Sequence, residues 1–483
     1  MRLRIASVAS CAALLLTAPA ALAGTPGRWT KLGQSNVDNI DEVALARTAD
    51  GTLHAVWTIP SHNNGGAGDA LVHAGITARG AASVPSAIAA DWASISAVPD
   101  LVTQPDGSLR VFFGGIRTTN PGEPNSNMNT ATAPATGAPW SLFAGTTVTG
   151  GAAYGADAGA AMLADGTPIV AFGGTGSGAF VHRGLDPGQP NVALQEQFGS
   201  CCGYSPDVAV DTASGVPTVA WYSNATGHLG VFTQPLDAAS GGTTAPPTLM
   251  PGSTTRFRGA VSSSQQLSRT PVAARAGGGV YVAYSGGYPT TSKALLWRVG
   301  ARSAMTLDRR KADHVVSLAA DPDGRLWVFW IVRGPRPTVV ARRSNRAATA
   351  FGPAVAAGRP PGQQSGYKLS GNAQRTRLDL VGLFGDSTSQ AQWHTQVLPG
   401  LAIKASPATI SGSRSTKVTF TVSDPDPVKG ATVRVAGRSA STDAGGRASI
   451  KLGPASKASL AVSVTKAGYT RGGTRVRVTR KRG

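Results

Sequence analysis

Charged side chains stand at matching places along this chain, each at or just before the start of a short apolar run. These places hold Asp41 or Glu42, Asp100, Asp157, Asp207, Arg269, and Asp313 with His314. Two carboxylates at a suitable separation can supply the acid and the base that cleave a glycosidic bond, and several can hold a cation such as Ca²⁺ through oxygen ligands. The alternative is that each Asp caps a strand by accepting nearby backbone N–H groups.

The apolar runs belong to a repeat that occurs seven times. Each unit has an apolar strand, an Asp-Gly-type turn and a second strand that ends in an aromatic residue, as in "PDLVTQPDGSLRVFFGG" from Pro99. Asp-Gly suits a tight hairpin because Gly and Asp tolerate positive φ. A third strand and a looser fourth follow in most units. Four antiparallel strands repeated at intervals of roughly 50 residues indicate a β-propeller.

We therefore predict an all-β chain with a seven-bladed β-propeller, or a six-bladed one if the weak last unit from Tyr367 is a linker. The last unit lacks an outer strand, while "GRWTKLG" from Gly27 precedes the first unit with nothing to pair with. We predict that this strand pairs near "QAQWHTQVL" from Gln390, which closes the ring and removes a free edge. The charged positions would then surround the mouth of the central channel.

The ends of the chain differ from the repeat. Residues 1–23 have the pattern of a secretory signal peptide, and no later segment is apolar for long enough to span a membrane. We assign residues 24–399 to the propeller, 400–474 to a small Ig-like β-sandwich and 475–483 to a basic tail. We expect a monomer that is secreted or associated with the cell envelope.

The charge is concentrated at the C-terminal end. From Gly400 onward there are 16 Lys and Arg residues but three Asp and no Glu. In an exported protein such charge favours an anionic envelope polymer or a phospholipid surface as partner rather than nucleic acid. The alternative is a solvated terminus without a partner.

Two segments carry a family resemblance. "RTPVAARAGGGVYVAYS" from Arg269 is similar to the Arg-Ile-Pro strand of sialidases, and "APATGAPW" keeps Gly137 and Trp140 of an Asp-box turn. The propeller thus resembles the sialidase-like, Asp-box superfamily of secreted propellers. The resemblance implies that Arg269 holds a substrate carboxylate through its guanidinium fork. Sialidase chemistry also needs a Tyr–Glu pair, an acid/base Asp and three arginines, whereas this chain offers three Glu and one candidate Arg.

The C-terminal segment resembles the small Ig-like modules that end many secreted bacterial proteins. In those modules a T-D-x-x-G turn joins two strands, and Thr442, Asp443 and Gly446 match that turn here. The resemblance implies a β-sandwich that spaces or attaches the main domain.

Two neighbouring cysteines, Cys201 and Cys202, precede Asp207 in "FGSCCGYSPD". Because export gives an oxidising environment, we predict a disulfide between them that shapes the loop leading to Asp207. The alternatives are two free thiols or bonds to another molecule.

Together these features predict an extracellular binding protein for a glycan or another surface polymer. The ligand would contact the channel mouth and the polar loops "PSHNNGGAGD" and "RTTNPGEPNSNMN". The alternatives are a glycoside hydrolase or lyase of sialidase-like type and a structural scaffold of the envelope. We expect no cofactor apart from the Ca²⁺ considered above, and no Cys/His metal spacing is present.

Overall fold

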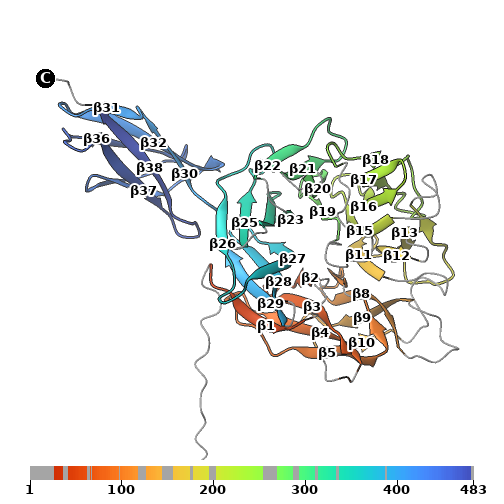
Figure 1. The fold of residues 1–483 in the computed structure, drawn as a ribbon. Helices are drawn as coiled ribbons and strands as arrows, with labels where there is room; N and C mark the ends of the chain where they lie inside the picture. The colour runs from red at the N-terminus through yellow and green to blue at the C-terminus, as the bar shows by residue number, and fades with distance from the viewer. Residues whose placement is uncertain are drawn as a thin grey trace, which may run out of the picture.

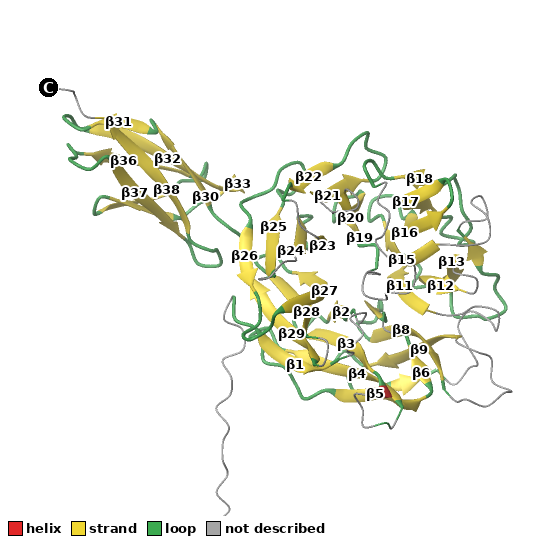
Figure 2. Cartoon of the chain, in the orientation of Figure 1, coloured by secondary structure: helices red, strands yellow, loops and turns green. Residues whose placement is uncertain are grey.

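A computed structural model describes residues 27–35, 42–61, 66, 68–96, 98–117, 127–143, 156–174, 178–194, 203–253, 269–286, 293–310, 314–332, 337–386 and 389–479. All of the named elements in these ranges are β-strands (Figure 2), Ser61 has 3₁₀-helical geometry, and no described residue is α-helical. The described part of the chain accordingly holds no helix that is long and apolar enough to cross a membrane.

Before residue 398 the described strands form seven antiparallel sheets, which stand around a common centre as in a β-propeller (Figure 1). The innermost strands are β2 (Ala44–Arg47), β7 (Asp100–Thr103), β11 (Ala156–Met162), β15 (Gly203–Val210), β19 (Val272–Ala274), β23 (His314–Ala320) and β27 (Ser365–Ala373). Each contacts the next in this order, and β27 contacts β2. The ring of innermost strands is therefore continuous.

The outer strands follow outward in sequence order in each sheet, except that the N-terminal strand is the outermost one of the last sheet. In the first three sheets they are β3 (Leu53–Ile59), β4 (Asp69–Ile76) and β5 (Ser86–Trp92); β8 (Leu109–Ile116), β9 (Asn127–Ala133) and β10 (Ser141–Leu142); and β12 (Pro168–Gly174), β13 (Gly178–Arg183) and β14 (Val192–Ala193). A short strand, β6 (Ser94–Ile95), also pairs with β8.

The remaining four sheets repeat this arrangement. Their outer strands are β16 (Pro217–Ala225), β17 (His228–Pro235) and β18 (Thr248–Leu249); β20 (Val280–Gly286), β21 (Lys293–Arg298) and β22 (Met305–Asp308); β24 (Leu326–Val332), β25 (Thr338–Arg343) and β26 (Val355–Gly358); and β28 (Leu378–Gly385), β29 (Gln390–Val397) and β1 (Thr30–Gln34).

The hairpin turns form as the Asp-Gly pattern predicts. In the second sheet, Gly107 has φ 84° and donates its N–H to Gln104 at 2.9 Å. The Asp106 carboxylate accepts the N–H of Ser108 at 2.9 Å. Only a residue that tolerates positive φ closes this turn without strain, so the dipeptide fixes the register of the two strands.

The aromatic residue near the end of the second strand packs between sheets. Phe112 on β8 is fully buried and shares a core cluster with Ala158 and Phe172 of the next sheet. Trp57, Trp221 and Phe329, at the equivalent places, are also fully buried. Burial of such large side chains between blades is the main apolar contribution to holding a propeller together.

The N-terminal strand pairs as predicted. β1 is antiparallel to β29, with Thr30 opposite His394 and Gln34 opposite Ala391. The indole Nε1 of Trp57 donates to the carbonyl of Gln34 at 3.0 Å, which ties β1 to the first sheet. The last sheet is thus made from both ends of the propeller sequence, and its outer edge is covered.

We expect deletion of residues 24–34 to lower the melting temperature sharply, because it uncovers the edge of β29. The milder Leu32→Ala should cost about 2–5 kcal/mol of unfolding free energy as a buried truncation, whereas Lys31→Thr, at an exposed position of the same strand, should change it by less than about 0.5 kcal/mol. Urea unfolding followed by Trp fluorescence isolates the propeller, because no Trp follows Trp393. An unchanged melting temperature after the deletion would contradict closure.

The C-terminal segment forms a two-sheet sandwich, hereafter the module. One sheet has β32 (Thr416–Asp424) between β30 (Ala402–Ser406) and β36 (Arg447–Leu452), with β33 (Asp426–Pro427) beside its end. The other has the order β31 (Thr409–Ser411), β38 (Gly472–Thr479), β37 (Ser459–Thr465), β34 (Thr432–Val435) and β35 (Arg438–Ser441). β38 runs to Thr479, so residues 475–479 of the expected basic tail lie in this strand.

The T-D-x-x-G turn joins β35 to β36. The Thr442 hydroxyl donates to the carbonyl of Val428 at 2.6 Å, and Asp443 accepts the N–H of Arg447 at 2.8 Å. Gly446 has φ 72°, and a Cβ there would lie 2.5 Å from the carbonyl oxygen of Val422. Each of the three matched residues therefore has a defined role in this turn.

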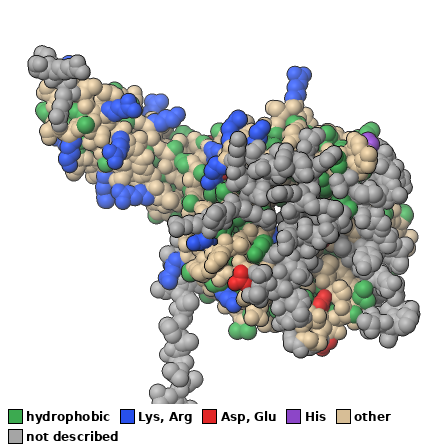
Figure 3. Space-filling model, viewed as in Figure 1, with side chains coloured by type: hydrophobic (Ala, Val, Ile, Leu, Met, Phe, Trp, Pro, Cys, Tyr) green, Lys and Arg blue, Asp and Glu red, His purple; other side chains and the backbone are tan. Residues whose placement is uncertain are grey.

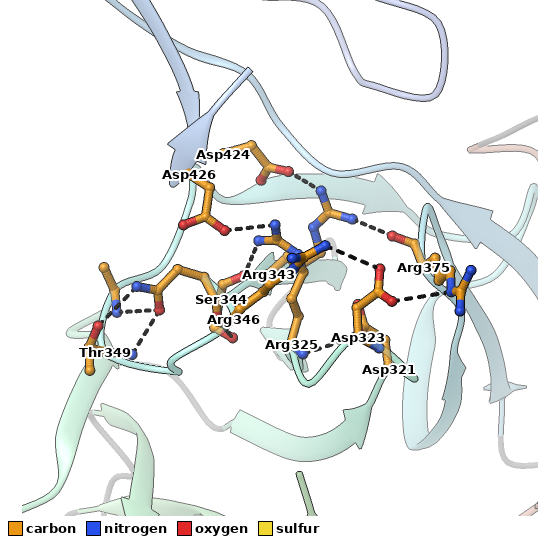
Figure 4. Close-up of polar contacts among 12 residues, drawn as sticks. Asp321, Asp323, Arg325, Arg343, Ser344, Arg346, Thr349, Arg375, Asp424 and Asp426 are labelled. Atoms are coloured by element: carbon orange, nitrogen blue, oxygen red, sulfur yellow. Dashed lines mark hydrogen bonds and ion pairs between the residues drawn. The ribbon is translucent and has the colours of Figure 1, made fainter. Parts of the chain in front are cut away.

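Two ion pairs, one of them buried, hold the module against the propeller (Figure 4). Arg343 on β25 bonds Asp424 on β32, and both side chains are almost fully buried. Arg325 bonds Asp426 at 2.7 Å. The Arg343 guanidinium also lies between Trp327 of the propeller and Tyr469 of the module. Burial raises the pKa of Asp424 to about 6, against the attraction of Arg343.

Candidate functional site

The central channel contains a cavity of about 110 Å³ with a polar wall. Charged side chains from several innermost strands, or from residues just before them, line it. They are Glu42, Asp100, Asp207 and Arg269. The backbone and side chains of Ser317 on β23 and of Ser370 and Gly371 on β27 complete the polar part of the wall. The sequence places these residues together because every innermost strand starts at the same end of the ring.

Arg269 crosses the channel from the fifth sheet toward the first and second. Its Nη1 lies 2.7 Å from Oδ1 of Asp100, and its Nη2 donates to the carbonyl of Pro99. Its backbone N–H donates to the Glu42 carboxylate at 3.0 Å. Arg269 therefore links the fifth sheet to the first and second sheets, which are not its neighbours in the ring, by charge-assisted bonds of the kind that are strongest in a buried setting.

Asp100 and Asp207 make the same contact to the following sheet. Asp100 accepts the N–H of Ala160 at 2.6 Å. Two residues earlier on the same strand, the N–H of Ala158 donates to the carbonyl of Val98 at 2.8 Å. Asp207 accepts the N–H of Val272 at 3.4 Å. Correspondingly, Thr270 donates to Ser205 at 2.9 Å. A Pro-Asp dipeptide thus joins neighbouring innermost strands at two places.

The same two aspartates also bond the backbone of their own strands. Each accepts the N–H of the next residue at 2.9 Å, Leu101 for Asp100 and Val208 for Asp207. Asp100 opens β7 and so has the capping role weighed from the sequence, whereas Asp207 lies inside β15, at the register shift that follows Tyr204. Gly159 allows the close approach, since a Cβ there would lie 2.6 Å from the Cα of Asp207.

Asp157 opens the third sheet in a strained backbone conformation, with φ 42°. Burial raises its pKa to about 6; the charge of Glu42 acts in the same direction, whereas Lys368 and Arg269 lower it. Lys368 is 1% exposed and lies on β27. Asp157 and Lys368 therefore belong to the same electrostatic cluster as Arg269.

The pKa values of Asp207 and Arg269 are both raised, but for different reasons. Burial raises the pKa of Asp207 to about 8, and the neighbouring Asp100 adds to this, while Arg269 opposes it. Burial alone would lower the pKa of Arg269, but Asp100, Asp207 and Glu42 raise it above its usual value. The guanidinium therefore stays charged.

The structure brings together four of the six residues predicted for the site: Asp100, Asp157, Asp207 and Arg269. Asp313 and the side chain of His314 lie outside the described residues, as do Cys201, Cys202 and most of the two polar loops. The backbone of His314 opens β23, opposite Val332.

Sequence reasoning did not find Lys368. A signal was present, because Lys368 is the second residue of "YKLSGNAQ" as Asp100 and Asp207 are the second residues of "PDLV" and "PDVA". All three aligned residues are charged, but Lys368 is positive whereas Asp100 and Asp207 are acidic.

The carboxylates of Glu42, Asp100 and Asp207 line the same cavity as the guanidinium of Arg269. In the described ranges, no three His, Cys, Asp or Glu side chains are grouped so that they could hold a metal ion. The guanidinium of Arg269, which the family resemblance implies for a substrate carboxylate, bonds Asp100 and Pro99 of this chain.

The Asp-box-like segment forms a packed turn away from the channel. A Cβ on Gly137, whose φ is 80°, would lie 2.6 Å from the rings of His54 and His73. The His73 ring packs on Trp140 at 5.4 Å, and His54 and His73 are 2.9 Å apart between Nδ1 and Nε2. Burial lowers the pKa of His73 to about 4, so this histidine pair is a neutral part of the core.

Comparison with known proteins gives no match to a family model and none to a curated protein sequence. Many solved structures show weak similarity, and three of them illustrate its level. An ulvan lyase bound to -[GlcA(1-4)Rha3S]- is 11% identical, with 76% of this chain and 95% of that chain covered and a TM-score of 0.47. A protein of unknown function from Dyadobacter fermentans is 15% identical over 62% of this chain and 94% of its own, with a TM-score of 0.41.

The third is the SapL1 lectin in complex with alpha methyl fucoside. It is 14% identical, with 68% of this chain and all (100%) of that chain covered, and the TM-score is 0.40. Similarity at this level assigns neither a ligand nor a reaction to the present chain.

The raised pKa of Asp157 gives a pH-dependent contribution to stability. As pH rises from about 4 to about 6, the unfolded carboxyl ionises before the folded one, so the folded state holds the extra proton and stability falls. Asp157→Asn removes this effect and suits the left-handed backbone. From about pH 4 to about pH 7, the wild-type unfolding free energy should fall by about 2 kcal/mol relative to the variant.

Urea unfolding of both proteins by Trp fluorescence, repeated across this pH range, measures the difference. Parallel pH profiles for wild type and Asp157→Asn would show that the carboxyl is not buried in the cluster.

Proposed function

We propose that this chain is a secreted, monomeric, seven-bladed propeller with a C-terminal Ig-like module, and that the propeller binds a hydroxyl-rich glycan at its channel. The observation that carries the proposal is the polar cavity, in which fixed donors and acceptors lie side by side. Arg269 supplies donors, Asp100, Asp207 and Glu42 supply acceptors, and Ser317 and Ser370 supply hydroxyls that can do either.

The chemistry of the wall favours hydroxyl groups over a free charge. Arg269 already bonds carboxylates of its own chain, so a ligand carboxylate would have to displace them. Sugar hydroxyls both donate and accept, and they can join such a network without adding a buried charge. A few convergent polar groups in a concave wall give a ligand site its specificity, and this cavity has such groups.

One observation favours glycan cleavage as a second candidate. Burial raises the pKa of Asp157 to about 6 and that of Asp207 to about 8, and a carboxyl that keeps its proton near neutral pH can act as a general acid. Asp207 is held by backbone N–H groups at both oxygens. Asp157 is therefore the better candidate for proton transfer.

The test uses variants that fill the cavity without touching the ionic cluster. Ser317→Val with Ser370→Val places methyl groups in the wall, and Ser86→Val with Ser141→Val makes the same change at exposed positions of outer strands. Wild type is first screened on an array of neutral and uronate-bearing oligosaccharides, and the best binder is then titrated into all three proteins by calorimetry.

We expect the cavity variant to lose at least about tenfold in affinity, because methyl groups leave sugar hydroxyls unpaired, and the surface variant to match wild type. Equal binding by both variants, or no binder on the array, would contradict the proposal and favour a structural scaffold. Release of chromophore from aryl glycosides by wild type but not by Asp157→Asn would favour the enzyme instead.

A further inference from the structure

The outer surface of the β30–β32–β36 sheet of the module carries cations and hydroxyls. We call it the basic face, and its residues are Lys404, Ser406, Lys417, Thr419, Thr421, Arg447, Ser449 and Lys451. All four cations are exposed. In Figure 3, Lys and Arg side chains lie at intervals over the module.

Strand register arranges the basic face in three rows. Lys417 is directly opposite Lys451 at one end. Lys404 and Arg447 flank Thr421 at the other end. The middle row has hydroxyls alone, with the Thr419 and Ser449 oxygens 3.0 Å apart. The charged rows are four residues apart along β32, which is about 14 Å at the usual strand rise.

The acidic residues of the module do not compensate this charge. Asp424 and Asp426 bond Arg343 and Arg325 of the propeller (Figure 4). Asp443, the third, accepts the N–H of Arg447 inside its own turn. Like charges directly opposite each other on a sheet are destabilising, so the Lys417–Lys451 pair has a cost that an external anion would remove.

The opposite sheet is also basic but is arranged differently. Its outward arginines, Arg434, Arg475 and Arg477, face Ser463, Ala461 and Ser459 of β37 rather than another cation. Arg475 donates to the Ser459 hydroxyl at 3.2 Å. This sheet therefore lacks the like-charged pair, and it provides a control of similar charge.

We propose that the basic face binds a linear anionic polysaccharide. The two charged rows suit anionic groups spaced along a chain, and the hydroxyl row between them suits the sugar hydroxyls of that chain. A membrane surface fits less well, because stable attachment to a bilayer uses apolar side chains as well as cations. The large apolar side chains that are exposed in the described residues all lie in the propeller.

This inference goes beyond the proposed function, since it concerns another domain and another ligand class. It gives the module the task of attachment to an acidic polymer, while the propeller channel contacts its own glycan. Either site can fail in experiment without affecting the other.

The test compares two fourfold variants of the full chain. The face variant has Lys404→Thr, Lys417→Thr, Arg447→Thr and Lys451→Thr, and Thr suits an exposed strand. The control variant has Arg434→Thr, Lys457→Thr, Arg475→Thr and Arg477→Thr, and it loses the same charge elsewhere on the module. The probes are immobilised polygalacturonate, uncharged dextran and vesicles of phosphatidylglycerol with phosphatidylcholine.

At low ionic strength we expect the face variant to bind polygalacturonate about tenfold more weakly than wild type, and the control variant less than about threefold more weakly. Dextran should not be retained, and added salt should weaken wild-type binding as exposed charges are screened. Equal loss in both variants would overturn the proposal, because net charge alone would then explain retention. Tighter wild-type binding to the vesicles than to polygalacturonate would overturn it as well.

A double variant tests whether a folding defect explains any loss of binding. Lys417→Thr with Lys451→Thr should leave the melting temperature of the module unchanged or raise it, since it removes a repulsive pair. It should still weaken binding to polygalacturonate severalfold. Full binding by this folded variant would contradict the proposal whatever the fourfold variant does.

Discussion

The charge of Arg269 inside the channel is the constraint on which the centre of the propeller depends. A guanidinium and several carboxylates removed from water are costly unless each finds its partners. Here the guanidinium bonds Asp100 and Pro99, and the backbone N–H of the same residue bonds Glu42. These contacts join the first, second and fifth sheets across the ring. The apolar clusters between neighbouring sheets hold adjacent blades, whereas this cluster fixes how distant blades stand around the channel.

The ionic cluster also makes the channel selective in what it can accept. Asp100 and Asp207 serve three purposes at once: each accepts a backbone N–H of its own strand, bonds the next strand, and lines the cavity. A ligand that replaced these bonds would break contacts between neighbouring innermost strands. A ligand that added hydrogen bonds through Ser317 and Ser370 would leave those contacts intact. In the module, by contrast, the cations of the basic face are exposed to solvent. The chain thus has a buried charge cluster in the channel, in which Arg269 and Asp100 bond each other, and an exposed group of cations on the module.

Much of the fold follows from local chemistry and could be read from the sequence. Asp106-Gly107 predicts a hairpin because only certain residues tolerate its backbone, and the unpaired strand at Trp29 predicts ring closure because a free edge must be covered. The positions of Asp100, Asp157, Asp207 and Arg269 at one mouth follow from the repeat. Their partners do not, because the bonds from Arg269 to Asp100 and Glu42 depend on how the ring closes in space. Lys368 was missed for a similar reason: its sign differs from that of the equivalent acids, and its burial near Asp157 is a tertiary effect.

The role of Arg269 in holding the channel together is tested by the unfolding free energy of Arg269→Met, measured in urea by Trp fluorescence at neutral pH. Because all nine Trp residues lie in the propeller, the signal reports on that domain. Removing the guanidinium leaves Asp100 buried without its ion-pair partner, while Glu42 keeps the backbone N–H of residue 269, and we expect a loss of about 3–5 kcal/mol. We also expect part of this loss to be recovered when Asp100→Leu is added, since contacting residues couple. A variant within about 0.5 kcal/mol of wild type, the range of an ordinary surface substitution, would contradict the claim that Arg269 holds the channel together.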